Sequence, residues 1–279
     1  MSKKALRRDE IGYWSEVKLD IVRKYASAYS TIMAKQPMIK RHIYIDAFAG
    51  AGQHISKSTG DFVAGSPLNA LRITPPFKEL HLIDLDGVKV GELRRLTAED
   101  KRVNVHQGDC NDILLRDVFP GCQYDDYHRA LCLLDPYGLS VNWDVPKRAG
   151  EMKSVEVFYN FMIMDANMNV FMKDPRKVTP EQAARMDAVW GDDSWRSAAY
   201  RKEPGLFGDM EEKATNEDIA EAFRVRLHDV AGFAFVPQPI PMRNEKGAII
   251  YYLYFASPNN TGAKIVSEIF DTYRMRGAH

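Results

Sequence analysis

The chain has 279 residues, of which 45% are hydrophobic and 27% charged, a globular composition that excludes disorder and fibrous repeats. Lys plus Arg and Asp plus Glu both number 38, so the formal net charge is zero. This balance excludes a protein whose whole body is basic and binds nucleic acid by charge alone, but it is compatible with a local basic patch.

Cysteine usage and the N-terminal sequence indicate a soluble protein of a reducing compartment. Cys110, Cys122 and Cys132 are an odd number with no CxxC spacing, which argues against a zinc site or a disulfide framework. The charged N-terminus lacks the apolar core of a signal peptide, and no run approaches about 18 uninterrupted apolar residues. We therefore expect a cytoplasmic protein without a metal.

The first elements in chain order are a helix and a strand. Over residues 13–35, apolar side chains recur at spacings of three and four, which predicts an amphipathic helix that ends before Pro37. Residues 42–48 (HIYIDAF) are β-branched and aromatic, as is typical of a buried strand. Ser66 and Pro67 then predict the start of a helix, with Ser66 as its cap.

Strands and helices continue to alternate through the middle of the chain. We predict a helix over 88–97 and four further strands, at residues 79–84, 103–106, 130–134 and 155–161. This alternation implies an α/β protein with a parallel sheet covered on both faces. Near the C-terminus, the aromatic runs 233–239 and 248–256 predict an antiparallel hairpin joined across 245–247, and a last helix covers 261–274.

One stretch departs from the alternation. Residues 164–212 contain Trp190, Trp195 and several charged turns but no strand pattern, so we predict an inserted helical cap before a helix at 216–230. The two tryptophans either anchor this cap in the core or stack on a substrate. We expect a single domain over 1–279, with residues 1–36 as an N-terminal helical segment.

A glycine loop follows the first strand. In YIDAFAGAG, Gly50 and Gly52 allow the backbone to approach a ligand at the carboxyl edge of the sheet, although a tight turn explains them equally well. No helix pattern follows before Ser66, so this loop is expected to be free to wrap a ligand. Asp46 lies inside the strand, where an unpaired carboxylate is costly, so we expect a donor or a cation beside it. His54 either contacts a cofactor carboxylate or is a surface histidine.

Acidic residues end the next two strands. Asp84 is placed to accept from the two hydroxyl groups of a ribose, whereas Asp86 suits the N-cap of the following helix. Asp109 would accept from an amino group such as that of adenine, or cap the next turn. Each acid alone has an ordinary structural explanation, but three acids at successive strand ends beside a glycine loop favour a nucleoside site.

The fourth strand ends in the sequence DPYG. Pro136 has no N–H and a fixed φ, so the strand stops and the carboxylate of Asp135 is held at the sheet edge. Asp135 would accept from an amino group on a planar base, on which the ring of Tyr137 would stack. A Pro-Gly turn with a packed tyrosine is the alternative. Asn160 and Asp165, which lie near the end of the fifth strand, would line the same wall or belong to a buried polar network.

These segments resemble a known family when they are taken together. YIDAFAGAG, HLIDLD, GDCND and LLDPYGL, in this order, resemble the Rossmann-like methyltransferases that use S-adenosylmethionine. Nearly the whole chain resembles the three-Cys-motif partner (TcmP) proteins of bacteria and phages, through WSEVKLDIVRKY, GSPLNAL, VFYNFMIMDAN and YYLYFASPNNTGAKIV. The resemblance implies a Rossmann-like methyltransferase sheet, S-adenosylmethionine as cofactor and a three-cysteine protein as partner.

The same resemblance implies a role for individual residues. Those that would line the methionine end of the cofactor are Asp46, Phe48, Ala49, Gly50 and Gly52. Those that would hold its nucleoside are Asp84 on the ribose, Leu85 against the adenine, and Asp109 and Cys110 at the adenine edge. Asp135, Pro136 and Tyr137 would face the transferred methyl group, like the (D/N)PP(Y/F) motif of amino-methylating enzymes. The sequence departs from that motif, because it has one proline and Gly138 stands where the aromatic residue would be.

The sequence therefore predicts an S-adenosylmethionine-dependent methyltransferase that acts on nucleic acid or on a nucleotide-type amine. The alternative is a catalytically silent, Rossmann-like binding subunit of a three-cysteine, radical-SAM-like partner. A dinucleotide dehydrogenase is disfavoured because the loop lacks GxGxxG, and cytosine-ring methylation because no Pro-Cys nucleophile follows the fourth strand. The basic N-terminus, with Lys3, Lys4, Arg7 and Arg8, is expected to be a solvated tail, with contact to phosphate as the alternative.

Overall fold

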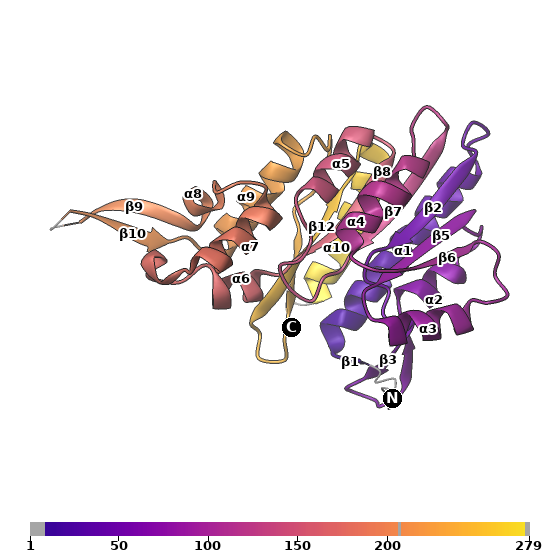
Figure 1. Cartoon of the computed structure of the whole chain (residues 1–279), viewed down its shortest axis with the longest axis horizontal. Coiled ribbons are helices and arrows are strands. Elements are labelled where there is room, and N and C mark those ends of the chain that lie inside the picture. Colours follow the sequence, from indigo (N-terminus) through magenta and orange to yellow (C-terminus); the bar gives the residue numbers. More distant parts are fainter. Residues whose placement is uncertain (1–8, 206–207, 277–279) are drawn as a thin grey trace.

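A seven-stranded mixed sheet forms the centre of the protein in the computed structural model, which describes residues 9–205 and 208–276 (Figure 1). Its strands in chain order are β2 (Arg41–Asp46), β5 (Glu79–Asp84), β6 (Val103–Gln107), β7 (His128–Leu134), β8 (Val155–Phe161), β11 (Ile240–Arg243) and β12 (Ile249–Ala256). Their order across the sheet is β11-β12-β8-β7-β2-β5-β6. The first five are mutually parallel, whereas β12 pairs antiparallel with both β8 and β11.

This order confirms the predicted fold class, an α/β protein with a Rossmann-like sheet that is mostly parallel and antiparallel at its C-terminal end. The chain begins in the middle of the sheet with β2, moves outward to β6, and then returns to β7 on the other side of β2. The strand order therefore reverses between β2 and β7. Ligands of open α/β sheets bind outside the carboxyl ends of the strands at such a point. Asp46 and Asp135 lie at the carboxyl ends of these two neighbouring strands, β2 and β7.

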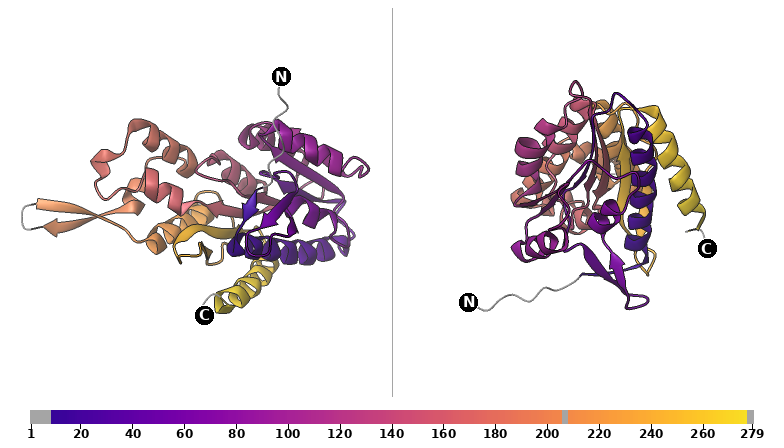
Figure 2. Two further views of the ribbon diagram at one scale, coloured as in Figure 1. Left: turned by 90° about the horizontal axis from the view of Figure 1, so that it is seen from below. Right: turned by 90° about the vertical axis from the view of Figure 1, so that its right-hand side faces the viewer.

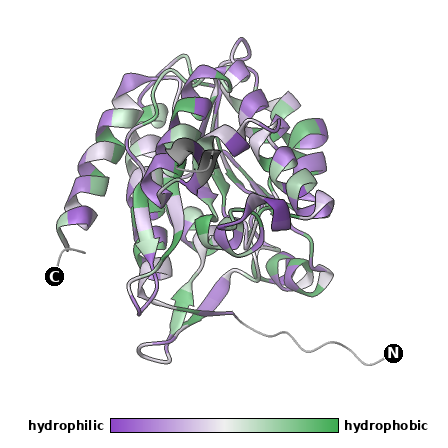
Figure 3. Ribbon diagram, turned by 90° about the vertical axis from the view of Figure 1, so that its left-hand side faces the viewer, coloured by the Kyte–Doolittle hydropathy of each residue, from purple (hydrophilic) through white to green (hydrophobic). Residues whose placement is uncertain are grey.

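Helices cover both faces of the sheet (Figure 2). One face carries α1 (Tyr13–Ala34), α2 (Ser66–Leu71), α3 (Gly87–Leu96) and α10 (Asn260–Arg276). The other carries α4 (Cys110–Ile113), α5 (Asp144–Met152) and α9 (Asn216–Asp229), with a π-helical turn at Leu114–Val118 and a 3-10 turn at Phe119–Gly121. Apolar residues concentrate in the strands between the two helical layers (Figure 3).

The N-terminal helix follows the predicted spacing closely. Its buried apolar positions include Val17, Ile21, Val22 and Tyr25, which recur every three or four residues and pack against Tyr44 and Phe158 of the sheet. Lys18 is also buried on this helix, with 8% of its surface exposed. A lysine is almost never this buried without a partner, and its partner lies at the sheet edge.

The loop after the first strand is not open, contrary to the prediction. It forms β3 (Gln53–Ser56) and β4 (Phe62–Ala64), and β3 also pairs in parallel with β1 (Glu10–Ile11). The predicted cap of the next helix is wrong as well, because Gly65 is the N-cap and Ser66 is the first helical residue. Gly65 donates its N–H to the carbonyl of Gly52 at 2.9 Å, and a Cβ at Gly65 would lie 3.0 Å from that oxygen.

The segment between β8 and α9 is only partly helical. It contains α6 (Ile163–Asn169), a 3-10 turn at Pro175–Lys177, α7 (Pro180–Trp190) and α8 (Trp195–Ala199), followed by a two-stranded ribbon, β9 (Tyr200–Gly205) with β10 (Gly208–Lys213). The predicted absence of strands is therefore wrong. Figure 1 shows this ribbon projecting away from the sheet. Trp190 and Trp195 are buried, which agrees with their anchoring the insertion.

The C-terminal hairpin is present, but its first strand lies later than predicted. Residues 233–239 form no strand, apart from one isolated bridge between Phe235 and Ser257, and β11 begins at Ile240. Pro237 and Pro239 lack the N–H that a sheet ladder requires, which accounts for the shift. In the part of the chain that the structure describes, no helix is both long and apolar enough to span a membrane.

Candidate functional site

Three neighbouring strands bring polar side chains to one place at the carboxyl edge of the sheet. Asp46 ends β2, Asp135 follows β7, and Asn160 is near the end of β8. They share the sheet face that α1 covers, since they continue the side-chain alternation of Tyr44, Leu133 and Phe158, which pack against that helix. We refer to Asp46, Asp135 and Asn160, together with Lys18 of α1, as the edge cluster.

Asp135 is held from two sides. Lys18 donates to one carboxylate oxygen as an ion pair, and the side-chain amide of Asn160 donates to the other. Asp135 is half-buried, and its negative charge raises the pKa of the Lys18 ammonium although burial lowers it. Lys18 therefore stays protonated. A carboxylate has about four lone-pair sites, so Asp135 keeps acceptor capacity beyond these two contacts.

Asp46 is the most deeply buried acid of the edge cluster. Burial, together with the nearby charge of Asp135, raises its pKa to about 7. The Ser66 hydroxyl and the Lys18 ammonium lower that pKa but do not compensate for the burial. Its Oδ1 accepts from the backbone N–H of Phe48 at 3.2 Å, whereas Oδ2 makes no hydrogen bond of good geometry. The cation expected beside Asp46 is thus Lys18.

Buried polar atoms without partners gather around the edge cluster. Among the residues that the structure describes, eight buried side-chain atoms lack a hydrogen-bond partner. Five of them belong to residues that interact with Asp135 or Lys18: Asp46 Oδ2, Asn160 Oδ1, His54 Nδ1 and the hydroxyl oxygens of Tyr44 and Tyr251. The Ser66 side chain also interacts with Asp46 and Tyr44, and the Ser15 side chain with Tyr251. Because native proteins pair nearly all buried polar groups, such a concentration indicates a site that a ligand completes.

The glycine loop and the second strand form an adjoining surface. Asp84 accepts from the N–H of Gly50 at 2.8 Å and from the N–H of Asp86 at 2.8 Å. Gly50 has φ +62°, and a Cβ there would meet no protein atom within 4 Å, so open space lies next to this backbone. Leu85 is 72% exposed beside Asp84. An acceptor, an open glycine backbone and an apolar side chain are the groups that a ribose and an adenine need.

Other residues predicted to hold the cofactor have structural roles. Gly52, at φ +81°, faces the leucines of α3, and a Cβ there would lie 3.3 Å from Leu93. Ala49 is buried, and Phe48 packs against the main core. Asp86 caps α3, as predicted, and Asp109 caps α4 through the N–H of Asn111 at 2.8 Å. Burial raises the pKa of the Cys110 thiol to about 12.

Tyr137 points away from Asp135. Its ring is 70% exposed, its hydroxyl donates to Asp9 at 2.9 Å, and the Lys89 ammonium lies 5.3 Å from the ring centroid. Lys89 also pairs with Asp9 at 2.8 Å. Tyr137 thus links the turn after β7 to α3 and to the segment before β1, on the side of Asp84. Stacking of its ring on a base held by Asp135 stays a prediction.

Gly138 and Asp165 explain the unusual end of the DPYG sequence. The N–H of Leu139 donates to Asp165 at 2.8 Å, and Arg185 pairs with the same carboxylate at 2.6 Å. A Cβ at Gly138 would lie 2.6 Å from Asp165 Oδ2, so a side chain cannot stand there while this network forms. Asp165 therefore supports the turn, whereas Asn160 contacts Asp135 directly.

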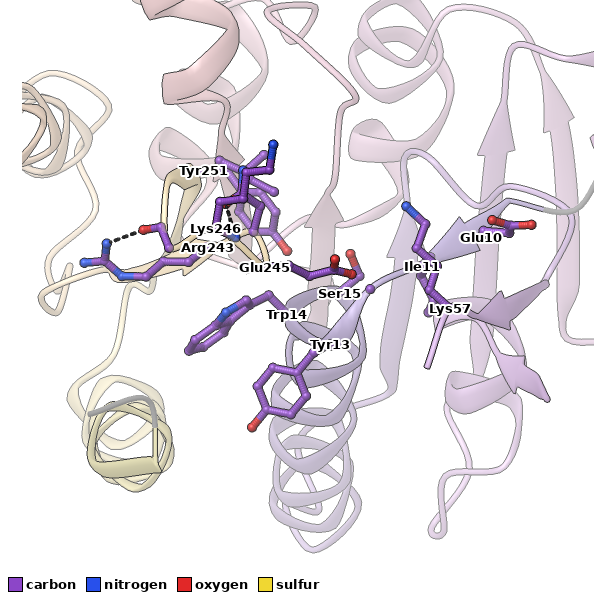
Figure 4. A pocket seen from close by; sticks show the side chains of 14 residues that line it. Glu10, Ile11, Tyr13, Trp14, Ser15, Lys57, Arg243, Glu245, Lys246 and Tyr251 are labelled. Carbon is purple, nitrogen blue, oxygen red and sulfur yellow. Dashed lines mark hydrogen bonds between the residues drawn. The ribbon is translucent and has the colours of Figure 1, made fainter. Parts of the chain in front are cut away.

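A cavity of about 810 Å³ opens beside the edge cluster, between the start of α1, residue Lys57 and the β11–β12 turn (Figure 4). Tyr251 lines it and connects it to the edge cluster, since the Lys18 ammonium lies 5.8 Å from the centroid of the Tyr251 ring. Sequence reasoning missed both residues. Lys18 was detectable as a lysine among the apolar positions of an amphipathic helix, whereas nothing in the pattern distinguishes Tyr251 from its aromatic neighbours.

Comparison with known proteins adds support at the level of the fold. No family model and no curated protein matches the chain. Protein LPL1258 from Legionella pneumophila, of family DUF519, is similar in structure, with a TM-score of 0.54, 14% identity, and coverage of 94% of this chain and 91% of its own. The methyltransferase domains of bacterial CtHen1-CN (TM-score 0.43, 10% identity, 88% and 100% covered) and of METTL16 (TM-score 0.41, 10% identity, 86% and 68% covered) are also similar.

Proposed function

We propose that the protein is an S-adenosylmethionine-dependent methyltransferase whose acceptor is an amine of a nucleic acid or nucleotide. The observation that carries this proposal is the group of unpartnered buried atoms at the switch point between β2 and β7. The open backbone of Gly50 and the exposed Leu85 lie along the same edge of the sheet. Together they supply a site for a nucleoside next to a site for a polar group.

The residues fit S-adenosylmethionine, which when bound would supply an electrophilic methyl group on a sulfonium. Asp84 would accept from the ribose hydroxyls through the lone pairs that Gly50 and Asp86 leave free. Leu85 would cover one face of the adenine. The edge cluster would carry a partial negative charge at neutral pH, because Lys18 offsets Asp135 and the pKa of Asp46 is about 7, and this charge would favour the cationic end of the cofactor.

The edge cluster would orient the acceptor amine. An amino group has two N–H bonds, and Oδ1 of Asn160 and a remaining lone pair of Asp135 are acceptors without enough donors. Binding both N–H groups fixes the direction of the nitrogen lone pair. Such positioning lowers the activation free energy by up to roughly 7–11 kcal/mol in favourable intramolecular models. Lys18 keeps its proton and holds the Asp135 carboxylate in place through their ion pair, and the proton that leaves the nitrogen after methylation would pass to water.

Calorimetric titration of the full chain with S-adenosylmethionine and with its demethylated product tests the proposal. We expect saturable binding, weakened at least tenfold by Asp84→Asn, which is about 1.4 kcal/mol. Leu85→Asn, an exposed change that leaves folding intact, should weaken binding several-fold. Asp126→Asn at the opposite edge of the sheet is the matched control and should bind normally. Absence of heat with both compounds would refute the proposal.

One observation favours the second candidate, a silent binding subunit of a three-cysteine partner. The Lys18–Asp135 ion pair and the Asn160 contact already occupy both oxygens of the carboxylate that would orient the acceptor. If this arrangement persists with cofactor bound, the isolated chain would transfer no methyl group. Transfer of labelled methyl groups to a mixture of RNA and DNA, measured with the chain alone and with the co-purified partner, separates the two candidates.

A further inference from the structure

We propose that the cavity beside the first turn of α1 binds a single-stranded nucleic acid, whose backbone phosphate lies at this helix end and whose base stacks on Trp14. The inference rests on the proposed function, because it specifies how the methyl acceptor would reach Asp135. Figure 4 shows the residues involved: Tyr13, Trp14 and Ser15 of α1 lie across from the β11–β12 turn, with Lys57 on the third side.

The start of α1 is open to an anion. Its N-cap is Gly12, and no side chain bonds to the N–H groups of the first turn. Residues 12–15 all line the cavity. The N–H groups of Ser15 and Glu16 already donate to the carbonyl of Gly12, at 3.0 and 3.2 Å, so the N–H groups left for an anion are those of Tyr13 and Trp14, at the positive end of a 22-residue helix. Backbone N–H groups at the start of a helix bind phosphate oxygens for both reasons.

Tyr251 provides an independent indication of a ligand. It is 6% exposed and lines the cavity, and its hydroxyl has no hydrogen-bond partner of good geometry, although Ser15 is close by. The ring of Tyr251 also lies close to the Lys18–Asp135 pair, with the Lys18 ammonium 5.8 Å from its centroid. A ligand in the cavity would satisfy the hydroxyl, and a group passing Tyr251 would reach the edge cluster.

The charged and aromatic residues that line the cavity indicate which class of ligand it binds. The cations are Lys57, Arg243 and Lys246, against the two acids Glu10 and Glu245. Arg243 donates to the carbonyl of Gly247 at 2.8 Å, and neither lysine forms an ion pair with any residue that the structure describes. Tyr13, 56% exposed, and Trp14 lie edge to face with ring centroids 5.4 Å apart.

An aromatic surface beside unpaired lysines is how proteins bind single strands, because each base stacks and each phosphate meets a cation. A duplex keeps its bases stacked and so cannot use Trp14. The zero net charge of the chain agrees with a local site of this kind, since the lining alone supplies the positive field. The volume, about 810 Å³, is near the upper end of the range of about 300–1,000 Å³ for ligand pockets.

Fluorescence anisotropy with a labelled single-stranded RNA of about 12 nucleotides, and with the DNA of the same sequence, tests this surface. The full chain is saturated with the demethylated cofactor. We expect Lys57→Glu/Lys246→Glu to weaken binding at least tenfold. The slope of log K against log salt should fall by about 1.4, since each contact to a single strand contributes about 0.7. Trp14→Leu should weaken binding several-fold without changing that slope.

The matched control is Lys78→Glu/Lys101→Glu, the same charge change at the amino ends of β5 and β6, which should bind as the wild type does. Equal losses in both double variants, equal affinity for a duplex of the same sequence, or no binding by the wild type would each overturn the inference. Calorimetry with the cofactor keeps the two proposals apart. If the wild type gives no heat but the cavity variants still lose the oligonucleotide, the methyltransferase proposal fails and the binding surface stands.

Discussion

Asp46 has no exposed surface, and its carboxyl group lies near that of Asp135. Burial raises its pKa to about 7 from the ordinary value of 3.8. The folded protein therefore binds this proton more tightly than the unfolded chain does. The contribution of Asp46 to stability is greatest below about pH 4 and decreases as the pH rises towards 7, because the unfolded state can ionise freely while the folded state cannot.

The variant Asp46→Asn should therefore become more stable relative to the wild type as the pH rises. Between pH 5 and pH 8 the difference in unfolding free energy should move by about 2.5 kcal/mol in favour of Asn, measured by urea unfolding at both values. Asp100→Asn is the control. Arg102 lowers the pKa of Asp100, so this acid is charged at both pH values. The difference in unfolding free energy between Asp100→Asn and the wild type should therefore not change with pH. If the difference in unfolding free energy between Asp46→Asn and the wild type were also constant, this would contradict a raised pKa for the buried Asp46.

Helix α1 places the charge of Lys18 at the sheet edge, although the packing of the helix does not require a charged residue there. Lys18 lies among apolar residues and pairs with Asp135, with side-chain exposures of 10% and 23%. We expect Lys18→Met to destabilise the protein by about 3 kcal/mol, because it leaves a largely buried carboxylate without its cation. Lys24→Met, which breaks the exposed pair with Asp20 on the same helix, should cost under about 1 kcal/mol.

Chemical unfolding at neutral pH measures both variants, and a double-mutant cycle isolates the pair. If Lys18 acts through Asp135, the double variant Lys18→Met/Asp135→Leu should lose less unfolding free energy than the two single variants lose together. Additive losses would show that Lys18 is needed for its stem packing against α1 neighbours instead. The distinction matters for the site, since only a coupled pair would fix the position of the Asp135 carboxylate beside the acceptor.

The elements that the sequence predicts well are those whose burial is periodic. The helix over 13–35 and the strands that end at Asp84, Leu134 and Phe161 follow from apolar spacing alone, and the strand ends then place Asp46, Asp84 and Asp135 at one edge. The ribbon β9–β10 was missed because its sequences, YRKEPG and GDMEEK, have no apolar run or alternation typical of a strand. The direction of Tyr137 could not be predicted either, since it depends on Asp9, far away in sequence.

At the scale of the whole molecule, the sheet and its two helical layers enclose a hydrophobic core on each face of the sheet, and the ribbon β9–β10 extends beyond them (Figure 2). Its base is attached: the N–H of Ala214 donates to Ala199 at 2.8 Å, and Arg201 pairs with Asp218 at 2.8 Å. The two strands otherwise pair only with each other. An isolated two-stranded ribbon is marginally stable in water.

Hydrogen exchange of the free protein should therefore separate the ribbon from the sheet. Amides of β9 and β10 should exchange through local opening with a free energy near zero, whereas those of β8 and β12, also an antiparallel pair, should exchange only at the free energy of global unfolding. The comparison holds antiparallel strand pairing constant and varies whether the strands belong to the seven-stranded sheet. Protection of the ribbon equal to that of β8 and β12 would show that another surface covers it in solution, and loss of that protection on dilution would identify a second copy of the chain.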